Sequence, residues 1–321
     1  MTAGPHGILL VDKAPERTSH DVVARVRWLL GTKKVGHAGT LDPMATGLLV
    51  LGVGQGTRLL TYLVGLGKTY ETTLRLGRAT STDDREGEPL GEQVDASALP
   101  QQLIEQHLHA LQGDIAQVPS TVSAIKIDGK RAYARARAGE DVQLAARPVR
   151  VSRFELTARR EDGEHLDLDA VIDCSSGTYV RALARDLGAA LEVGGHLTAL
   201  RRTVVGPFSV SEAALVPARG EGDDVELPLH GLGEIASLVL SSLRVDAEQS
   251  AALGTGQRIT TSARLTPPRW QQPGAQPGAA AAAGEEAPVA ALDDSGRLIA
   301  LLEREQERWK PILVVPDDAR C

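Results

Sequence analysis

Apolar and polar positions follow one another along this chain in patterns that predict both strands and helices. Residues 7–12 and 47–53 are short apolar runs typical of buried strands, and residues 68–77 alternate between apolar and polar positions. Between the first two runs, the sequence VVARVRWLL has the period of an amphipathic helix, which Ser19 or Asp21 can cap.

The middle of the chain continues this mixture. Residues 147–159 and 166–174 both alternate, with EDGE between them, and predict an antiparallel pair of strands. Residues 96–113 and 175–191 have helical periodicity, and residues 122–139 predict a strand, an Asp-Gly turn and a helix. Antiparallel strands with segregated helices favour the α+β class over alternating βαβ units.

The pattern changes after about residue 235, where a helix and short strands are expected. A Pro/Gly/Ala-rich tract at about 268–289 has no core-forming pattern and is interpreted as a flexible insertion. We therefore predict a larger domain of residues 1–238 and a small β-rich domain of residues 239–321.

Composition and charge narrow the functional classes. The chain has no apolar run of membrane-spanning length and no signal peptide, which favours a cytoplasmic protein, and its two cysteines argue against a disulfide framework or a Cys-rich zinc site. The net charge is −7, but residues 123–153 hold eight basic and three acidic residues. Such a segment suits a polyanion bound at one face, although on charge alone solvated helix faces are the simpler explanation.

The motifs of several common sites fail on spacing. GVGQGTR at 52–58 is neither a dinucleotide-binding turn nor a P-loop, and TSTDDREG at 80–87 lacks the ligand series of a calcium loop. The chain has neither H-E-x-x-H nor G-x-S-x-G. No metal and no cofactor are predicted.

The sequence GHAGTLDPMATG, which starts at Gly36, places a single carboxylate, Asp42, in a tight turn ahead of a buried strand. An Asp-Pro pair is usually only a turn, because Asp bonds its own backbone and Pro fixes φ. Taken alone, Asp42 is therefore more simply a structural residue than a catalytic one.

Six sequence blocks, taken in order, change this interpretation. Together they resemble the TruB family of tRNA pseudouridine synthases, the bacterial enzymes that act at position 55 of the tRNA T loop. The resemblance covers nearly all of residues 7–210, and the last part of the chain looks like the small PUA RNA-binding domain of bacterial members. The blocks are GILLVDKAP (7–15), GHAGTLDPMATGLLVLGVGQGTRL (36–59), KTYETTLRLGRATSTDDREG (68–87), VPSTVSAIKIDGKRAY (118–133), GTYVRALARDLG (177–188) and HLTALRR (196–202).

The resemblance implies a pseudouridine synthase fold, with a mixed, largely antiparallel central sheet flanked by helices. It also implies a cofactor-free isomerisation of uridine, in which the glycosidic bond is broken and then re-formed at C5. Asp42 matches the family's catalytic carboxylate, and Arg181 matches the Arg that pairs with it and orients it. Tyr179 matches the Tyr beside the uracil ring, with removal of the C5 proton as a hypothesis. The covalent and glycal forms of the mechanism both stay open.

Other matches concern substrate binding. His37 corresponds to the residue that fills the space left by a flipped base, Tyr70 to an aromatic that stacks on the target, and Leu200 to an apolar position of the pocket. Further residues are expected near the substrate, namely Lys13, Gly36 and Thr40. Basic side chains expected to contact the RNA backbone are Lys33, Lys34, Lys126, Lys130, Arg131 and Arg150.

The expected partner is tRNA, through its T stem-loop, and a monomer is expected. Two alternatives stay open. The chain could remodel tRNA as a binding protein on the same surface, or it could modify other RNAs that contain a T-loop-like fold. A pure binding protein would not need Asp42, Tyr70, Tyr179 and Arg181 together, which favours the enzyme.

Overall fold

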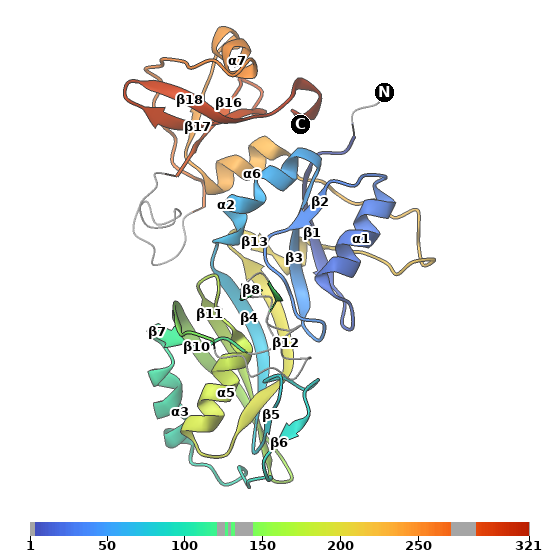
Figure 1. The fold of residues 1–321 in the computed structure, drawn as a ribbon, viewed down its shortest axis with the longest axis vertical. Coiled ribbons are helices and arrows are strands. Elements are labelled where there is room, and N and C mark those ends of the chain that lie inside the picture. The colour runs from blue at the N-terminus through green and yellow to red at the C-terminus, as the bar shows by residue number, and fades with distance from the viewer. Residues whose placement is uncertain (1–3, 121–125, 128–129, 132–143, 271–286, 321) are drawn as a thin grey trace. The chain divides into compact units, whose positions relative to one another are not determined.

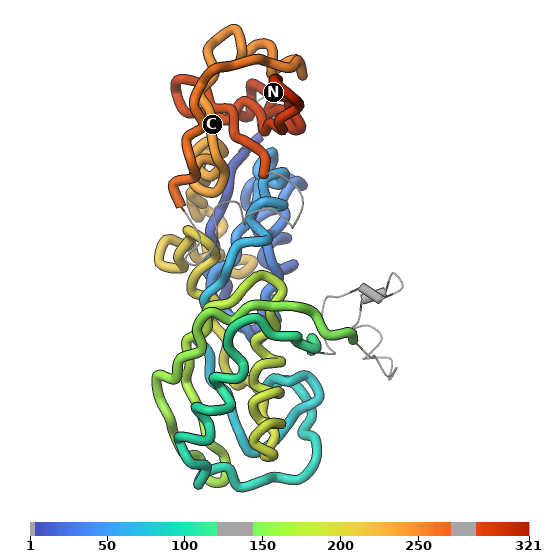
Figure 2. Tube along the Cα trace, turned by 90° about the vertical axis from the view of Figure 1, so that its left-hand side faces the viewer, coloured from blue at the N-terminus to red at the C-terminus, as the bar shows by residue number. Residues whose placement is uncertain are grey.

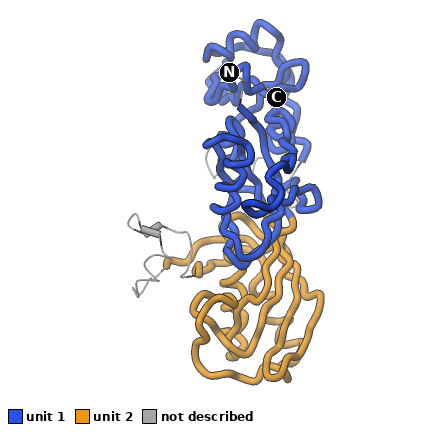
Figure 3. The backbone as a smooth tube through the Cα atoms, turned by 90° about the vertical axis from the view of Figure 1, so that its right-hand side faces the viewer, with its two compact units in different colours: residues 1–66, 204–321 blue, residues 67–203 orange. Residues whose placement is uncertain are grey.

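The structure is a computed structural model that describes residues 4–120, 126–127, 130–131, 144–270 and 287–320. The chain divides into two compact units, Met1–Leu66 with Val204–Cys321 and Gly67–Thr203, coloured separately in Figure 3. The helix expected after the Asp-Gly turn and most of the Pro/Gly/Ala-rich tract lie outside the described residues. The expected α+β class is confirmed.

The first unit begins with a group of paired strands. The strand β1 (Gly7–Lys13) pairs antiparallel with β3 (Thr46–Val53), and β3 also pairs antiparallel with the short β2 (Val35–His37). Both apolar runs of the sequence are thus strands, and they are almost completely buried. The short strand β14 (Ala214–Leu215) adds to β1 in parallel.

The helix α1 (Ser19–Leu29) lies between β1 and β2 in the chain, and its start differs from the expectation. Neither Ser19 nor Asp21 is the N-cap, because Thr18 takes that position and its hydroxyl accepts a hydrogen bond from the Asp21 amide. The Asp21 carboxylate in turn accepts from the backbone N–H of Thr18, which completes a capping box. The hydroxyl of Ser19 is thereby left for another partner.

The C-terminal part of the first unit contains a four-stranded sheet in the order β15-β16-β17-β18. Figure 1 labels three of these strands, β16, β17 and β18. The strands β16 (Val289–Leu292) and β17 (Leu298–Glu305) pair antiparallel and are among the short strands that the sequence predicts after residue 235. One apolar core runs from Ile8 of β1 through Ile235 of α6 to Leu301 of β17. The remaining elements of this unit are η1 (Gly54–Arg58), α2 (Leu60–Val64), β13 (Phe208–Ser209), η2 (Val210–Glu212), α6 (Leu232–Val239), β15 (Ser242–Arg244), α7 (Ala247–Gly254), β16 (Val289–Leu292), β17 (Leu298–Glu305), β18 (Arg308–Val314) and η3 (Asp317–Ala319).

The second unit is built on strands in the order β12-β4-β11-β10-β7. The predicted antiparallel pair is β10 with β11, and β11 buries every second residue from Leu166 to Cys174. The helix α5 lies on one side of these strands, with α3 beside it (Figures 1 and 2). The elements are β4 (Lys68–Leu76), β5 (Ala79–Thr80), β6 (Pro89–Leu90), α3 (Gln101–Ala110), β7 (Gly113–Gln117), β8 (Lys126–Ile127), β9 (Lys130–Arg131), β10 (Arg147–Asp162), β11 (His165–Cys174), α5 (Val180–Ala190) and β12 (Gly195–Val205).

A glycine sets how closely α5 approaches the sheet. A Cβ atom added to Gly188 would lie 2.3 Å from the backbone of Gly194 and of Gly195, where the chain turns into β12. Real Cβ atoms do not approach a backbone so closely, so only glycine permits this contact. The contact fixes the helix whose first turn carries Arg181.

We expect Gly188→Ala to destabilise the protein, because the new methyl group overlaps backbone that cannot move aside. Overpacking of this kind costs about 1–3 kcal/mol, which corresponds to a loss of about 5 °C in melting temperature. The control is Gly65→Ala, since a Cβ at Gly65 meets nothing within 4 Å. Thermal melts followed by circular dichroism compare the two, and equal melting temperatures would contradict the packing argument.

Candidate functional site

Asp42 lies in residues 38–45, which connect β2 to β3. The turn leaves the sheet after the amide of Ala38 donates to the carbonyl of Val50, 2.9 Å away, and it closes where the amide of Ala45 donates to the carbonyl of Asp42 at 3.1 Å. Asp42 is half-buried, whereas its neighbour Leu41 is buried. The carboxylate is therefore carried by a turn whose apolar side chains anchor it in the core.

Lys13, the last residue of β1, binds the backbone of this turn. Its side chain is only 1% exposed. The ammonium donates to three backbone carbonyls, those of Ala14 at 3.1 Å, Arg17 at 2.6 Å and Pro43 at 3.0 Å. The sequence placed Lys13 near the site, and the bond to Pro43 shows that it fixes the residue directly after Asp42.

Two further predicted residues lie at the start of the same turn. His37 ends β2 opposite Leu51, and its ring meets that of His20 edge-on, with 5.9 Å between centroids. Gly36 pairs with Gly52 of β3. A Cβ atom at Gly36 would lie 3.2 Å from the side chain of Leu60, so packing alone explains a glycine here, without contact to a substrate.

The remaining predicted residues near this turn lie on the surface. Thr40 is exposed within the turn, and Lys33 and Lys34 are exposed just before β2. Both lysines are thus available to a partner that approaches β2.

The second unit carries the predicted aromatic and apolar residues on neighbouring strands. Tyr70 lies on β4 opposite Ile172 of β11, and Leu200 lies on β12; Tyr70 and Leu200 are each 7% exposed. The hydroxyl of Thr72 donates to the carbonyl of Ala199 at 2.7 Å, which ties β4 to β12 beside these two side chains. The structure therefore brings Tyr70 and Leu200 into one part of the sheet.

Arg181 lies in the first turn of α5, directly after Tyr179, the N-cap, and Val180. Its guanidinium donates to the carbonyl of Thr82 at 2.8 Å and forms an ion pair with Asp84 at 3.3 Å. Both charged side chains are only 4% exposed. In such surroundings an ion pair is held tightly, since little water competes for either charge.

Asp84 is the residue that sequence reasoning missed. One of its carboxylate oxygens accepts from the hydroxyl of Thr82 at 2.6 Å and from the amide of Glu86 at 3.0 Å, and the other faces Arg181. The sequence TSTDDREG shows only acidic residues in a loop, and nothing in it indicates an arginine almost a hundred positions away. Asp84 therefore orients Arg181 from within the same unit.

The predicted site residues fall into two sets, one in each unit. Lys13, His37 and Asp42 belong to the first unit, while Tyr70 and Arg181 belong to the second. The pairing of Arg181 with Asp42 stays a prediction.

Four of the residues predicted to contact the RNA backbone lie in the second unit. Lys126 pairs with Arg131, and Ile127 with Lys130, in the short ladder of β8 and β9, but their side chains lie outside the description. Arg150 is exposed and forms an ion pair with Asp114 at 3.1 Å. An exposed pair of this kind is weak, so Arg150 can exchange its partner for a phosphate.

An unusual electrostatic environment surrounds Lys68 at the start of β4. Lys68 is 8% exposed and lies opposite Cys174 in the β4–β11 ladder. Burial, helped by the charge of Arg202, lowers the pKa of Lys68 to about 8. Burial likewise raises the pKa of the Cys174 thiol to about 11, which makes it a poor nucleophile.

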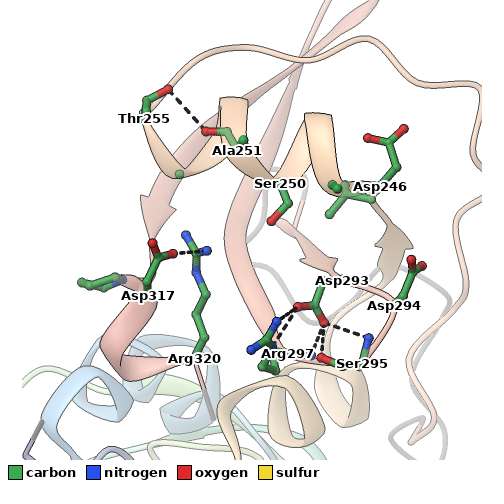
Figure 4. A pocket seen from close by; sticks show the side chains of 14 residues that line it. Asp246, Ser250, Ala251, Thr255, Asp293, Asp294, Ser295, Arg297, Asp317 and Arg320 are labelled. Atoms are coloured by element: carbon green, nitrogen blue, oxygen red, sulfur yellow. Dashed lines mark hydrogen bonds and ion pairs between the residues drawn. The ribbon is translucent and has the colours of Figure 1, made fainter.

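The C-terminal part of the first unit contains a hollow of about 700 Å³ between α7 and the turn that joins β16 to β17 (Figure 4). Three carboxylates of its lining have partners within the protein: Asp246 accepts from the amide of Gln249, Asp293 pairs with Arg297, and Asp317 pairs with Arg320. Burial opposes ionisation of Asp293, but hydrogen bonds from Ser295 and Arg297 outweigh it and hold the pKa of Asp293 at about 2. Among the described residues, no group of three or more His, Cys, Asp or Glu side chains could hold a metal ion.

The described part of the chain also contains no helix that is long and apolar enough to cross a membrane.

Comparison with known proteins places the chain among RNA-modifying enzymes. Residues 27–180 match the model of the TruB family pseudouridylate synthase (N terminal domain), and residues 181–218 match that of the tRNA pseudouridylate synthase B C-terminal domain. The chain is 52% identical over 309 residues to tRNA pseudouridine synthase B of Nocardia farcinica, which covers 96% of this chain and 93% of that protein. It is 49% identical over 310 residues to the protein of the same name from Rhodococcus jostii. That alignment covers 96% of this chain and 93% of the relative.

Solved structures show the same fold. The chain resembles one in a crystal structure of a Cbf5-Nop10-Gar1 complex, with a TM-score of 0.66 and 25% identity over 98% of this chain and 86% of that one. A chain of the archaeal box H/ACA sRNP Nop10-Cbf5 complex gives a TM-score of 0.64 and 23% identity. That comparison covers 98% of this chain and 88% of the other.

We expect Asp84→Asn to lower the free energy of unfolding by about 3 kcal/mol, because it removes one charge of a buried ion pair. The matched control is Asp114→Asn, which breaks the exposed pair with Arg150 and should cost less than about 1 kcal/mol. Urea denaturation of both variants measures the difference. Similar losses in the two would show that burial does not strengthen the Arg181–Asp84 pair.

Lys68 predicts a dependence of stability on pH. Its folded pKa of about 8 lies below the ordinary value of 10.5, so between these pH values the unfolded chain binds more protons and stability rises with pH. Lys68→Met should lack this rise. From pH 7.5 to pH 10 the stability of the wild type should therefore increase relative to that of Lys68→Met. Thermal melts at both pH values test this, with Lys34→Met as the exposed control. A constant difference between wild type and Lys68→Met would contradict the lowered pKa.

Proposed function

The chain belongs to the TruB family of pseudouridylate synthases, and on this premise we propose that it isomerises a tRNA uridine to pseudouridine at position 55 of the T loop. The observation that carries the proposal is the half-buried carboxylate of Asp42, in a turn tied to the core by the bond from Lys13 to Pro43. A turn held in this way can present one carboxylate repeatedly in the same geometry.

The reaction assigns a specific task to Asp42. The bond between N1 of uracil and C1′ of ribose breaks, the base turns over, and C5 bonds to C1′ while the C5 proton is lost and N1 gains a proton. Positive charge develops on the sugar when the first bond breaks. A carboxylate can attack that carbon or stabilise its charge, so Asp42 suits both the covalent and the glycal form of the mechanism.

Substrate and product contain the same atoms in the same oxidation state. No group has to be brought in or carried away, and we therefore propose that the protein works without a cofactor. Acid–base chemistry remains, and we assign removal of the C5 proton to Tyr179.

Arg181 supports Asp42 in this proposal. A guanidinium carries five donors in a planar fork, so the ion pair with Asp84 is compatible with a second carboxylate. Asp84 would fix the plane of the fork, and the fork would aim Asp42. Tyr70 and Leu200 would then provide the aromatic and apolar walls against the uracil ring.

The target base has to leave the folded T loop before it can react. Extrusion costs a few kcal/mol, which stacking in the pocket and a side chain in the vacated space must offset. We assign that space to His37, at the end of β2 next to the Asp42 turn. Lys33, Lys34 and Arg150, with the basic residues of β8 and β9, would contact phosphates.

The C-terminal residues would enlarge the RNA surface. We propose that residues 239–321 form a PUA-like domain attached to a catalytic domain of residues 1–238, which the separate four-stranded sheet from β15 to β18 supports. An enzyme that acts on tRNA would work in the cytoplasm, and one chain would contain all the residues named.

We expect the protein to form pseudouridine at position 55 of an unmodified tRNA transcript, as mapped by carbodiimide reaction and primer extension. Asp42→Ala should form no detectable product and still bind the tRNA with a Kd within about three-fold of the wild type, because only the reacting carboxylate is removed. Glu71→Gln, which removes an exposed carboxylate of β4, is the control for loss of charge.

Three outcomes would contradict the proposal. Product from Asp42→Ala would reject the catalytic carboxylate, and product at another uridine would reject the position. Tight tRNA binding with no product from the wild type would favour a tRNA-remodelling protein instead.

A further inference from the structure

Ser19 binds both backbone groups of the residue that precedes Asp42. Its hydroxyl accepts a hydrogen bond from the amide of Leu41 at 2.9 Å and donates one to the carbonyl of the same residue at 3.1 Å. Ser19 is 1% exposed and Leu41 is 3% exposed, so water has little access to any of these groups. One hydroxyl therefore satisfies two buried backbone groups.

These two bonds restrict the conformation at Asp42. A peptide unit is planar, so the bond to the Leu41 carbonyl fixes the plane that also contains the amide nitrogen of Asp42. On the other side, Pro43 confines Asp42 to extended backbone conformations, and Lys13 holds the Pro43 carbonyl. The backbone of Asp42 is thus held from both sides.

Gln117 binds Tyr179 in the same manner within the other unit. The Gln117 side-chain oxygen accepts from the amide of Tyr179 at 2.8 Å, and its side-chain nitrogen donates to the carbonyl of Tyr179 at 3.0 Å. Gln117 ends β7 and is 2% exposed. Both peptide planes that flank Tyr179 are held, which sets the direction of its side chain and the start of α5.

We propose that Ser19 and Gln117 are positioning residues of the isomerisation, each of which clamps the backbone of one catalytic turn. Ser19 clamps the turn of Asp42, and Gln117 clamps Tyr179, from which α5 leads to Arg181. This inference rests on the proposed function. Each clamp lies wholly within one unit, so each can be tested independently of the other.

The chemistry of each clamp matches its task. The Ser19 hydroxyl is not needed to cap α1, because Thr18 and Asp21 already form the capping box. A neutral amide at Gln117 can donate and accept at once, whereas an ionised carboxylate of the same size can only accept. A small displacement of a catalytic group can cost about a hundred-fold in rate, so clamps of this kind affect turnover more than substrate binding.

The experiment uses two pairs of full-length variants. Ser19→Ala removes both bonds to Leu41, and its control Thr18→Ala weakens the same helix without touching the turn. Gln117→Glu keeps the size of the side chain but loses the donor, and its control Gln101→Glu makes the same exchange at an exposed helix position. The single-turnover rate is measured by tritium release from tRNA labelled at C5 of uridine, tRNA Kd by filter binding, and backbone protection by hydrogen–deuterium exchange.

We expect Ser19→Ala and Gln117→Glu to lose at least about ten-fold in single-turnover rate, with tRNA Kd unchanged within two-fold. Exchange should accelerate at the amide of Leu41 in Ser19→Ala. In Gln117→Glu the carboxylate still accepts from the amide of Tyr179, so exchange should accelerate instead at the amide of Leu183, which bonds the Tyr179 carbonyl that Gln117 no longer holds. Both controls should keep at least half of the wild-type rate. A normal rate in either clamp variant overturns the positioning role of that residue, as does an equal loss in its control. If Ser19→Ala does not fold, Ser19→Cys, whose thiol is a weaker donor and acceptor of similar size, decides the role of Ser19 by the same rate measurement, and Gln117→Glu decides that of Gln117.

Failure of the proposed function gives a different result. A wild-type protein that releases no tritium would refute the isomerase assignment, and with it catalytic positioning. The exchange data would then show only whether the two clamps hold their turns.

Discussion

A turn whose apolar side chains are buried has to find hydrogen-bond partners outside the strand ladder that stabilises its neighbours. Here the turn from residue 38 to 45 buries Leu41, so its backbone groups need partners inside the protein. Ser19 and Lys13 supply them, one on each side of Asp42. Both partners lie at the ends of elements, because β1 ends at Lys13 and α1 begins at Ser19.

The second unit meets the same need with a buried ion pair. Arg181 is held by Asp84, and Asp84 by Thr82 and Glu86, so the charge on the guanidinium is fixed in position before any substrate binds. Burial of two charges is costly and seldom adds net stability. The pair in the first turn of α5 therefore contributes orientation of Arg181 more than net stability. A fixed guanidinium agrees with the proposed role in orienting a second carboxylate.

The sequence predicts the fold better than it predicts the residues that hold the candidate site residues in place. Buried strands at 7–12 and 47–53, and the pair of strands around EDGE, follow from periodicity, which local sequence contains. Asp84 and Gln117 could not be found in this way, because each acts on a residue that is 62 or more positions distant. For Ser19 the sequence indicates only a helix cap, because a hydroxyl at a helix start has that local use. Its actual partner depends on where the turn after β2 lies in space.

The two sides of Asp42 are clamped by groups of different charge, and the difference has a physical consequence. Lys13 carries a buried positive charge, but three carbonyl oxygens surround its ammonium and partly neutralise its field. Ser19 is neutral, so its bonds to Leu41 fix the turn without adding a charge beside the carboxylate. In the proposed mechanism Ser19 and Lys13 would set where Asp42 points, and the Arg181 fork would keep its carboxylate ionised. A charged side chain in place of Ser19 would place a field beside the carboxylate, so that orientation and ionisation would then depend on the same residue.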